Sequence, residues 1–400
     1  MTETDAPRQA DLFASMKRAG RILFAASALL VAACQSIVPK GPGPAQPTGP
    51  APTGPEVTEG LPTDTLRHRV ALLVPMSGPN AGVGQSIANA TTLALLDTKA
   101  DKVRITTYDT GVGAAAAASK ALADGNKLIL GPLLAEDARI VGPIAARANV
   151  PVISFSNDVS VAGNGVYIMG YNPNQSIERV VDFAKGKGLS HFAALVPRGV
   201  YGERSGTSLL RAVESAGGTV VSMQTFDRTP TSIAAAVKKL QASSSYDALL
   251  IADSGKVAMQ VAPIVRKNGG ATARLLGTEL WNTDNGLASS PVLRGAWFAS
   301  VSDGLYSQLA TKYRARYGNA PFRLSALGYD AVLLTVRIAR DWKPGSTFPA
   351  ARLRDAGGFS GIDGAFRFGR DGIAERALEV SEIGAGTLTV VAPAPRSFAE

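Results

Sequence analysis

The chain has 400 residues, of which 46% are apolar and 18% are charged, and its formal net charge is +9. This length is sufficient for two or three domains with sizeable cores, and the composition excludes an intrinsically disordered chain. The basic residues are scattered, without an Arg/Lys run or an aromatic RNA-binding signature. We therefore expect no nucleic-acid partner.

The amino terminus has the pattern of a bacterial export signal. Three basic residues precede an apolar stretch over 22–33, which is too short to span a membrane comfortably. The stretch ends in Val-Ala-Ala before Cys34, the single cysteine, and this resembles the lipobox of bacterial lipoproteins. We predict a signal peptide over 1–33 and a membrane anchor through lipidated Cys34. The alternative is a secreted protein with one unpaired thiol. Gln35, where an Asp would favour the inner membrane, predicts an outer-membrane lipoprotein facing the periplasm.

A spacer follows the anchor. Residues 34–68 comprise Cys34 and a segment rich in Pro and Gly without a period, which has no apolar face to bury. Its Pro-rich part, Pro39–Pro62, would extend on the order of 70 Å at roughly 3.1 Å per residue. We predict a tether that lets the following domain work at a distance from its anchor.

Short apolar strands alternate with helical segments after the tether. The first unit is the strand Val70–Val74, a breaker-rich loop over 75–84 and a helix from Gln85. Further strands are expected at 103–108, 128–130, 152–154, 191–196, 219–226, 248–252 and 275–277. Further helices are expected at 114–123, 136–148, 177–187, 204–216, 233–240 and 257–267. Strands separated by long helices predict parallel sheets with right-handed crossovers, and these units are too many for one sheet. We expect an α/β fold with two lobes.

Near the carboxyl terminus the pattern predicts a hairpin. Ala365–Phe368 alternates like a strand, and the Gly-Arg-Asp-Gly sequence that follows it favours a turn. We expect Leu378–Ile383 to return as the second strand of that hairpin.

Four stretches resemble the type I periplasmic binding proteins of the Leu/Ile/Val-binding kind: VALLVPMSGPNAGVGQSI, LILGPLLAEDARIVGPIAARANVPVISFS, FAALVPRGVYGERSG and LSALGYDAVLL. The resemblance runs in order from Arg69 to about Val391. The resemblance implies two Rossmann-like lobes with parallel sheets, joined by a hinge of three crossings. It places those crossings near 171–175, 300–304 and 343–361. The implied segments are 69–172 plus 303–345 for lobe 1, 173–302 plus 346–391 for lobe 2, and 392–400 as a tail.

A narrower resemblance comes from the lipid anchor, the tether, the GPLL motif and the closing FSGIDGAFRFGRDGIAERALEVSEI. These features are similar to those of penicillin-binding protein activator lipoproteins. The resemblance implies a non-enzymatic protein that docks onto a bifunctional peptidoglycan synthase and stimulates it, thereby regulating cell-wall synthesis. The alternative is a solute-binding receptor of an ABC transporter for an amino acid or a small amide.

Relatives of the Leu/Ile/Val-binding kind hold an amino acid between the lobes, and the resemblance assigns candidate ligand-cleft residues to this chain. They are Ser77, Gly78, Ala135, Ser156, Asn157, Asp158, Tyr201, Glu279 and Trp281. Tyr201 and Glu279 match an aromatic position and the acidic residue that holds the ligand ammonium. Ala135 lacks the hydroxyl of the family, and an ionised Asp158 would repel a ligand carboxylate. A cleft kept as architecture, with its polar residues solvated, is the alternative to a small ligand.

Three tryptophans differ in their sequence surroundings. Trp281 is flanked by Glu279, Asn282 and Asp284, so we expect it to be exposed in a loop, where it would suit a partner surface. Trp297 and Trp342 lie in or beside apolar segments and are expected in the core.

No enzyme motif is evident in the sequence. Two histidines and one lipidated cysteine cannot form a His/Cys metal cluster, and neither a Gly-x-Ser-x-Gly nor a Ser-x-x-Lys motif occurs. A glycosidase-like carboxylate pair stays open as an alternative among Asp109, Asp253, Glu279 and Asp284. We expect a protein that is not an enzyme and has no cofactor and no metal.

Overall fold

The structure is a computed structural model that describes residues 66–242, 245–283, 286–396 and 398. The predicted signal peptide, Cys34 and the tether up to residue 65 lie outside the described residues, so they stay predictions. Within the described ranges, no helix combines the length and the apolar character needed to cross a bilayer.

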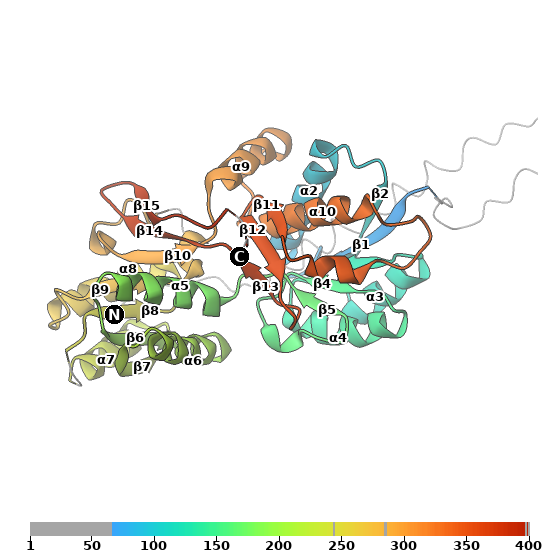
Figure 1. The fold of residues 1–400 in the computed structure, drawn as a ribbon. Coiled ribbons are helices and arrows are strands. Elements are labelled where there is room, and N and C mark those ends of the chain that lie inside the picture. Colours follow the sequence, from blue (N-terminus) through green and yellow to red (C-terminus); the bar gives the residue numbers. More distant parts are fainter. Residues whose placement is uncertain (1–65, 243–244, 284–285, 397, 399–400) are drawn as a thin grey trace, which may run out of the picture. The chain divides into compact units, whose positions relative to one another are not determined.

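Lobe 1 is built on a five-stranded sheet of order β2-β1-β3-β4-β5, in which every pair of neighbours is parallel (Figure 1). Its strands are β1 (His68–Val74), β2 (Val103–Asp109), β3 (Leu128–Leu130), β4 (Val152–Ser154) and β5 (Val166–Ile168). Its helices are α2 (Ala81–Asp97), α3 (Ala114–Ala123), α4 (Ala135–Arg147), α9 (Gly304–Tyr317) and α10 (Ser325–Ala339).

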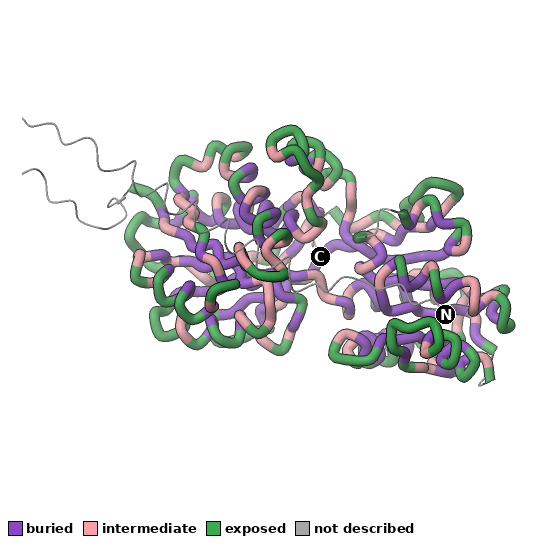
Figure 2. The backbone as a smooth tube through the Cα atoms, turned by 180° about the vertical axis from the view of Figure 1, so that it is seen from behind, coloured by how far each residue is buried: buried purple, intermediate pink, exposed green. Residues whose placement is uncertain are grey.

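The period-two alternation of β1 supplies both halves of the lobe 1 core. Val70, Leu72 and Val74 pack in one cluster with residues of α2 and α10. Ala71 and Leu73 pack on the opposite face with residues of α3 and α4. The strand is therefore buried on both faces, as its continuous apolar sequence predicts, and Figure 2 shows the buried strands beneath more exposed helices.

Lobe 2 contains a seven-stranded sheet of order β15-β14-β10-β9-β8-β6-β7. Its strands are β6 (His191–Pro197), β7 (Thr219–Phe226), β8 (Ala248–Ile251), β9 (Arg274–Gly277), β10 (Trp297–Ser300), β14 (Glu379–Ile383) and β15 (Leu388–Ala392). Its helices are α5 (Pro173–Gly186), α6 (Val200–Ser215), α7 (Pro230–Gln241) and α8 (Gly255–Lys267). The described residues also form short 3-10 helices, namely η2 (Glu279–Thr283) and η3 (Pro291–Leu293) in lobe 2, and η1 (Val159–Val161) and η4 (Ala350–Arg354) beside the lobe 1 core.

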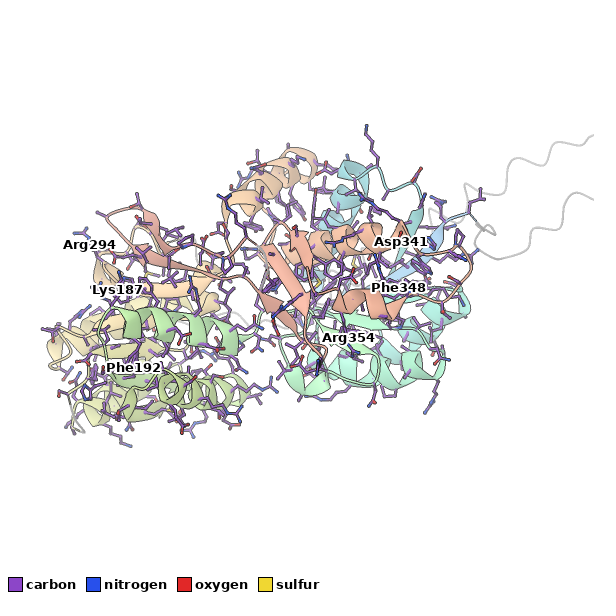
Figure 3. All side chains as sticks on the ribbon, viewed as in Figure 1. Lys187, Phe192, Arg294, Asp341, Phe348 and Arg354 are labelled. Carbon is purple, nitrogen blue, oxygen red and sulfur yellow. The ribbon has the colours of Figure 1, made fainter. Side chains whose placement is uncertain are left out.

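In lobe 2, the two faces of β6 supply both halves of the core, as the two faces of β1 do in lobe 1. Phe192, Ala194 and Val196 of β6 pack with residues of α5 and α6, whereas Ala193 and Leu195 pack with α7 and α8. Phe192 is fully buried and is labelled in Figure 3. The sheet is parallel from β10 to β7, but β14 and β15 join it antiparallel, so it is mixed and not purely parallel.

A third, antiparallel sheet consists of β11 (Phe359–Gly361), β12 (Gly364–Phe368) and β13 (Ala374–Arg376). Its side chains Phe359, Phe366 and Phe368 pack in the same cluster as the β1 residues of lobe 1. The region before β14 therefore packs with lobe 1, in contrast to the prediction that 346–391 belongs to lobe 2. The third crossing consequently lies at 377–378, between β13 and β14, and not within 343–361.

The predicted hairpin has a different second strand. The chain turns at 369–372, as expected, but β12 then pairs with β13. The predicted partner segment is β14, which instead pairs with β10 and β15. Its apolar residues Val380 and Ile383 are fully buried in the lobe 2 core, and this burial is what draws the strand away from β12.

The helix that follows the first strand of each lobe, α2 after β1 and α6 after β6, packs closely on the end of that strand. A Cβ atom added to Gly84 of α2 would lie 1.8 Å from the Pro75 carbonyl oxygen, and one added to Gly202 of α6 would lie 1.6 Å from that of Pro197. Only glycine permits this approach. The α2 helix begins at Ala81, four residues before the predicted start, because Gly82 and Gly84, which were assigned to the loop, lie in its first turn.

Candidate functional site

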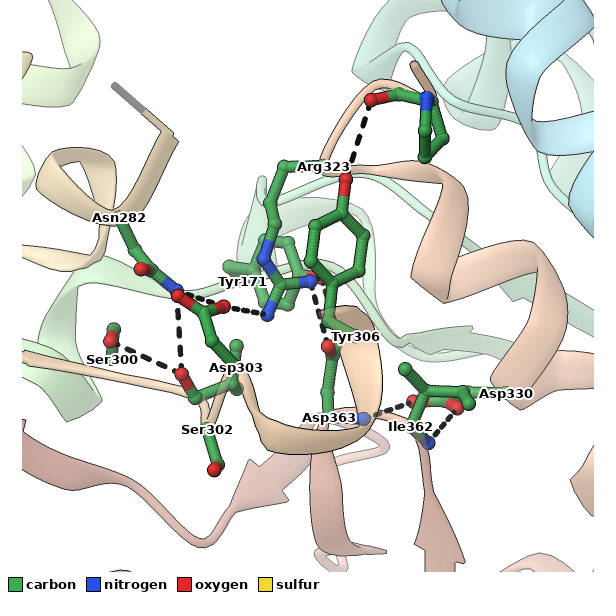
Figure 4. Close-up of polar contacts among 12 residues, drawn as sticks. Tyr171, Asn282, Ser300, Ser302, Asp303, Tyr306, Arg323, Asp330, Ile362 and Asp363 are labelled. Carbon is green, nitrogen blue, oxygen red and sulfur yellow. Dashed lines mark hydrogen bonds and ion pairs between the residues drawn. The ribbon is translucent and has the colours of Figure 1, made fainter. Parts of the chain in front are cut away.

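Three short segments connect the lobes, at 169–172, 301–303 and 377–378. A buried arginine contacts a residue in each of the first two segments (Figure 4). Arg323, from the segment between α9 and α10, donates from Nη1 to Asp363 Oδ1 at 2.7 Å and to the Tyr171 hydroxyl at 3.2 Å. Its Nη2 lies 3.3 Å from Asp303 Oδ1. Because Tyr171 and Asp303 belong to the first and second crossings, one guanidinium group joins both to lobe 1.

A second arginine holds the third crossing. Arg376, the last residue of β13, donates from Nη2 to the Met169 carbonyl at 2.7 Å. Asp330 of α10 is fully buried nearby and accepts from the Ile362 and Asp363 backbone N–H groups. Burial and the negative charge of Asp363 raise the pKa of Asp330 above its ordinary value. The hinge is thus a buried ionic network.

A cavity of about 310 Å³ lies beside this hinge, and we call it the cleft cavity. It is lined mainly by apolar side chains from the loops after β1, β3 and β4 and from η2. The lining residues are Asn80, Val83, Leu133, Leu134, Phe155, Asn157, Tyr171, Glu279, Leu280, Thr283 and Leu324. Its position at the carboxyl ends of parallel strands is the usual ligand position in an open α/β sheet.

The predicted cleft residues do not all come together. Asn157 and Glu279 line the cleft cavity. Ser77 and Gly78 lie in the loop after β1, where Gly78 is exposed with φ +75°, and Ala135 is the first residue of α4. None of these three lines the cavity, and neither do Ser156, Asp158, Tyr201 and Trp281.

Glu279 is buried and bonded within the protein. Its Oε2 accepts from the Ser176 hydroxyl at 2.6 Å, and its Oε1 accepts from the Tyr201 hydroxyl at 3.0 Å. Tyr201 also contacts Thr278 Oγ1 at 2.9 Å. Burial raises the pKa of Glu279, although the two hydroxyl hydrogen bonds act to lower it. Tyr201 and Glu279, paired in the predicted site, are therefore in direct contact.

Asp158 is neutralised by two arginines. Its carboxylate accepts from Arg139 Nη2 at 2.6 Å and from Arg204 Nη2 at 2.5 Å, and Ser160 donates to it as well. Burial acts to raise the pKa of Asp158, but the hydrogen bonds from Ser160 and Arg204 outweigh it and hold the pKa below the ordinary value. The expected repulsion of a carboxylate by a bare Asp158 charge is therefore wrong, because two guanidinium groups compensate that charge.

This ion pair also connects the lobes. Arg139 belongs to α4 of lobe 1, whereas Arg204 belongs to α6 of lobe 2. The Ser156 hydroxyl accepts a hydrogen bond from the Asp158 backbone N–H at 3.0 Å, so it binds within its own loop. We call the Asp158–Arg204 contact the interlobe ion pair.

Trp281 is fully buried, so the prediction that it is exposed is wrong. It lies in the lobe 2 core with its ring centroid 6.1 Å from that of Phe298. The 3-10 helix η2 explains the error, because residues three apart share a face in that geometry. Glu279 and Asn282 therefore face the hinge together, while Trp281 faces the core. Trp297 and Trp342 are buried, as predicted.

Several polar residues of this region were missed in the sequence, among them Ser176, Arg204, Arg323 and Arg376. Their partners lie far away in the chain, and the sequence around a single basic residue does not indicate which residue it will contact. The Asn-Pro pair before α5 was the one local signal, since the Asn172 side chain caps the helix that carries Ser176.

The candidate carboxylate pair is not supported by the described carboxylates. Asp109 Oδ1 accepts from the Met76 and Gly111 backbone N–H groups, both at 2.7 Å, and so holds the loop after β1. Asp253 pairs with Arg228 at 2.8 Å, and Glu279 accepts from hydroxyls. Asp284 lies outside the described residues. In the part of the chain that the structure describes, no three His, Cys, Asp or Glu side chains are grouped to hold a metal ion.

The sequence matches the family model described as periplasmic binding protein over residues 68–387. The chain belongs to the periplasmic binding protein family. Proteins of this family are generally ligand binders of the periplasm or cell envelope and not enzymes. The two-lobed α/β architecture with parallel sheets agrees with this family, so the predicted fold class is confirmed.

Solved structures in this family share the fold at low sequence identity. A putative branched-chain amino acid ABC transporter protein from Rhodospirillum rubrum is 20% identical with a TM-score of 0.71, covering 82% of this chain and 100% of that chain. Full-length LpoA from Haemophilus influenzae is 18% identical with a TM-score of 0.62, and the match covers 82% of this chain and 59% of that one.

One curated relative is the uncharacterised protein RP748 of Rickettsia prowazekii, which is 28% identical over 136 residues. That match spans 34% of this chain and 36% of the relative's length.

Proposed function

We propose that this protein is an envelope-anchored, non-enzymatic regulator that docks onto a bifunctional peptidoglycan synthase and stimulates it. In this proposal the lipidated Cys34 holds the chain at the outer membrane, and the Pro-rich tether lets the two-lobed domain reach its partner. The proposal concerns the whole protein, because the tether and the domain serve one task.

The proposal rests on one observation. The polar groups that were expected to hold an amino acid are bonded to other side chains of the protein. Glu279 accepts two hydroxyl hydrogen bonds, and Asp158 is paired with Arg139 and Arg204. A ligand ammonium or carboxylate would have to displace these contacts, and breaking a hydrogen-bonded buried group is costly. A domain whose own side chains satisfy its cleft is suited to present a surface to a protein partner.

LpoA is 18% identical to this chain, so the two proteins share a fold and nothing more is shown. This shared fold is in agreement with the proposal. The lipobox-like sequence and the tether support an anchored protein with reach, and both belong to the sequence before the described residues.

The proposal is tested by capturing partners from detergent-solubilised envelope with the immobilised full chain. We expect a bifunctional synthase to be retained, and the purified full chain to increase the rate of glycan polymerisation by that synthase. Glu279→Gln should leave both results unchanged, because the carboxylate lies inside the cleft cavity. Retention of an ABC permease without any synthase would overturn the proposal.

A second candidate function has one specific observation in its favour. The cleft cavity of about 310 Å³ is largely apolar and carries Glu279 in its lining. A cavity of this kind would suit a small apolar solute with a hydrogen-bond donor, as in a receptor that delivers an amino acid or small amide to an ABC transporter.

Titration calorimetry separates the two functions. We expect Leu, Ile, Val and short wall peptides to show no submillimolar binding to the full chain, because Glu279 and Asp158 are already occupied. Micromolar binding of one of these amino acids that disappears in Glu279→Gln would establish the receptor function instead.

A further inference from the structure

The strand β15 forms one edge of the lobe 2 sheet, and among the described strands its one neighbour is β14 (Figure 1). The outer side of β15 therefore presents backbone N–H and C=O groups that no described strand pairs. Its residues from Leu388 to Val391 are all exposed. Three of these four are apolar, with exposed fractions of 40% for Leu388, 48% for Val390 and 37% for Val391. We call residues 388–391 the free edge.

The other edges of the two large sheets lack this character. The edge strand β2 exposes only Thr107, β7 exposes only Thr219 and Thr225, and β5 is buried throughout. Proteins commonly protect a sheet edge with charged residues or proline, but neither occurs in Gly384–Ala392. The free edge thus combines unpaired backbone groups with exposed apolar side chains.

The pairing with β14 shows which face of the free edge is apolar. Leu388 lies opposite Ile383, and Val390, two residues further, shares its face. On that face Ile383 packs in the core with residues of α7 and α8. Thr389 lies on the other face, opposite Glu382. A strand added at the free edge would gain main-chain hydrogen bonds, and its alternate side chains would contact Leu388 and Val390.

We propose that the free edge pairs with an extended, uncharged segment of the peptidoglycan synthase that carries apolar side chains at alternate positions. This inference rests on the proposed function and names the docking surface for it. A second copy of this chain is a poorer occupant, because the formal net charge of +9 opposes the approach of two copies.

The size of the free edge also argues against a stable dimer. A strand of five residues is about 17 Å long, so it supplies only a fraction of the roughly 800 Å² that each partner buries in a stable interface. A contact of this size is effective when the partner is held nearby. The predicted anchor and tether would provide this condition in the envelope, because they raise the effective concentration.

The test compares Val390→Glu with Leu210→Glu in the full chain. Leu210 is an apolar residue of α6 with an exposed fraction of 51%, so both variants place a charge at an exposed apolar position of lobe 2. The synthase that the immobilised parent retains is purified, and its glycan polymerisation is measured against the concentration of added chain. Val390→Glu should raise the half-maximal concentration by at least about tenfold, because a charge opposes strand pairing at an edge. Leu210→Glu should act like the parent.

Hydrogen exchange gives a second measurement that needs no variant. Adding the synthase to the parent should slow amide exchange at 388–391, whereas exchange at 219–226, on the opposite edge of the sheet, should stay the same. The urea unfolding midpoints of both variants are measured as a control for folding.

The outcomes separate this inference from the proposed function. If Val390→Glu stimulates like the parent, or if exchange at 388–391 does not slow, the free-edge proposal is overturned while the proposed function stands. If the parent retains and stimulates no synthase, the proposed function fails and this inference fails with it. Dimerisation of the parent in sedimentation equilibrium that is absent in Val390→Glu would assign the edge to a second copy and overturn the proposal.

Discussion

Asp158 and Glu279 are both buried acids, but the groups around them have opposite consequences. Asp158 is surrounded by guanidinium groups that favour its charged form, whereas Glu279 accepts hydrogen bonds from two hydroxyls and has no ion-pair partner among the described residues. The pKa of the first is lowered and that of the second is raised. Their contributions to stability therefore change with pH in opposite directions.

The interlobe ion pair should be energetically coupled. A double-mutant cycle with Arg204→Gln and Asp158→Asn, measured by urea unfolding at pH 7, should give a coupling energy of about 1–3 kcal/mol. The contribution should be lost as the pH falls below 3.8, the ordinary Asp value, because a lowered pKa means that the folded state favours the charged form.

Arg198 and Asp227 provide the control for this cycle, since they form an ion pair at 2.9 Å with side chains 71% and 51% exposed. A cycle on that pair should give less than about 1 kcal/mol. Equal coupling energies for the two pairs would mean that the interlobe contact does not hold the lobes together.

Glu279→Gln should change the pH dependence of stability in the other direction. Because burial raises the pKa of Glu279, the folded state favours the protonated acid, and the wild-type protein loses stability as the pH rises above 4.5. The variant has no such group, so its free energy of unfolding relative to the wild type should increase from pH 4 to pH 8. The exposed Glu203→Gln serves as control, and a parallel pH profile for wild type and Glu279→Gln would contradict this assignment.

At the scale of helices and strands, the sequence was most informative where burial is a local property. The elements 114–123, 128–130, 152–154 and 219–226 agree with the predicted bounds, because apolar runs and helical spacing are set by each segment's own neighbours. The partner of β12 could not be read in this way. Strands 374–376 (Ala-Glu-Arg) and 379–383 (Glu-Val-Ser-Glu-Ile) are both short and mix charged with apolar residues, and only packing against the two cores decides which joins which sheet.

The candidate site was less predictable for the same reason. Glu279 and Tyr201 were located, but the hydroxyl of Ser176 and the guanidinium groups of Arg204 and Arg323 reach their partners across the fold. Trp281 was placed wrongly because its polar neighbours were taken to describe its own surroundings, whereas one turn of 3-10 helix separates them by face.

The close packing of α2 on the end of β1 can be tested with two glycines of one helix. Gly84→Ala should lower the free energy of unfolding by more than about 2 kcal/mol, because the new Cβ would overlap the Pro75 carbonyl and force the helix away. Gly82→Ala is the matched control, since its Cβ would meet the Phe322 ring at 3.5 Å, an ordinary contact. We expect that variant to be neutral or slightly more stable, given the higher helix propensity of Ala. Similar losses from both variants, measured by urea unfolding, would exclude this explanation.

For the molecule as a whole, the predicted anchor would decide where the domain works. Cys34→Ser should abolish incorporation of labelled palmitate, because the thiol is the predicted site of acylation. The variant should also leave the membrane fraction, since stable anchoring requires more than one acyl chain. Gln35→Asp is the matched control, which should stay labelled but move to the inner membrane. Unlabelled wild-type protein would remove the lipoprotein prediction.

The order in which the chain is synthesised gives the third crossing a further consequence. Lobe 1 is complete only after β13, and β10 of lobe 2 obtains its neighbour β14 only when 379–383 has emerged. Both lobes must therefore wait for nearly the whole chain before either can finish folding. A product that stops shortly after residue 378 would contain a finished lobe 1 and an open β10 edge with unpaired N–H and C=O groups. Such an edge is a template for aggregation, so truncated chains should be recovered as insoluble or degraded protein.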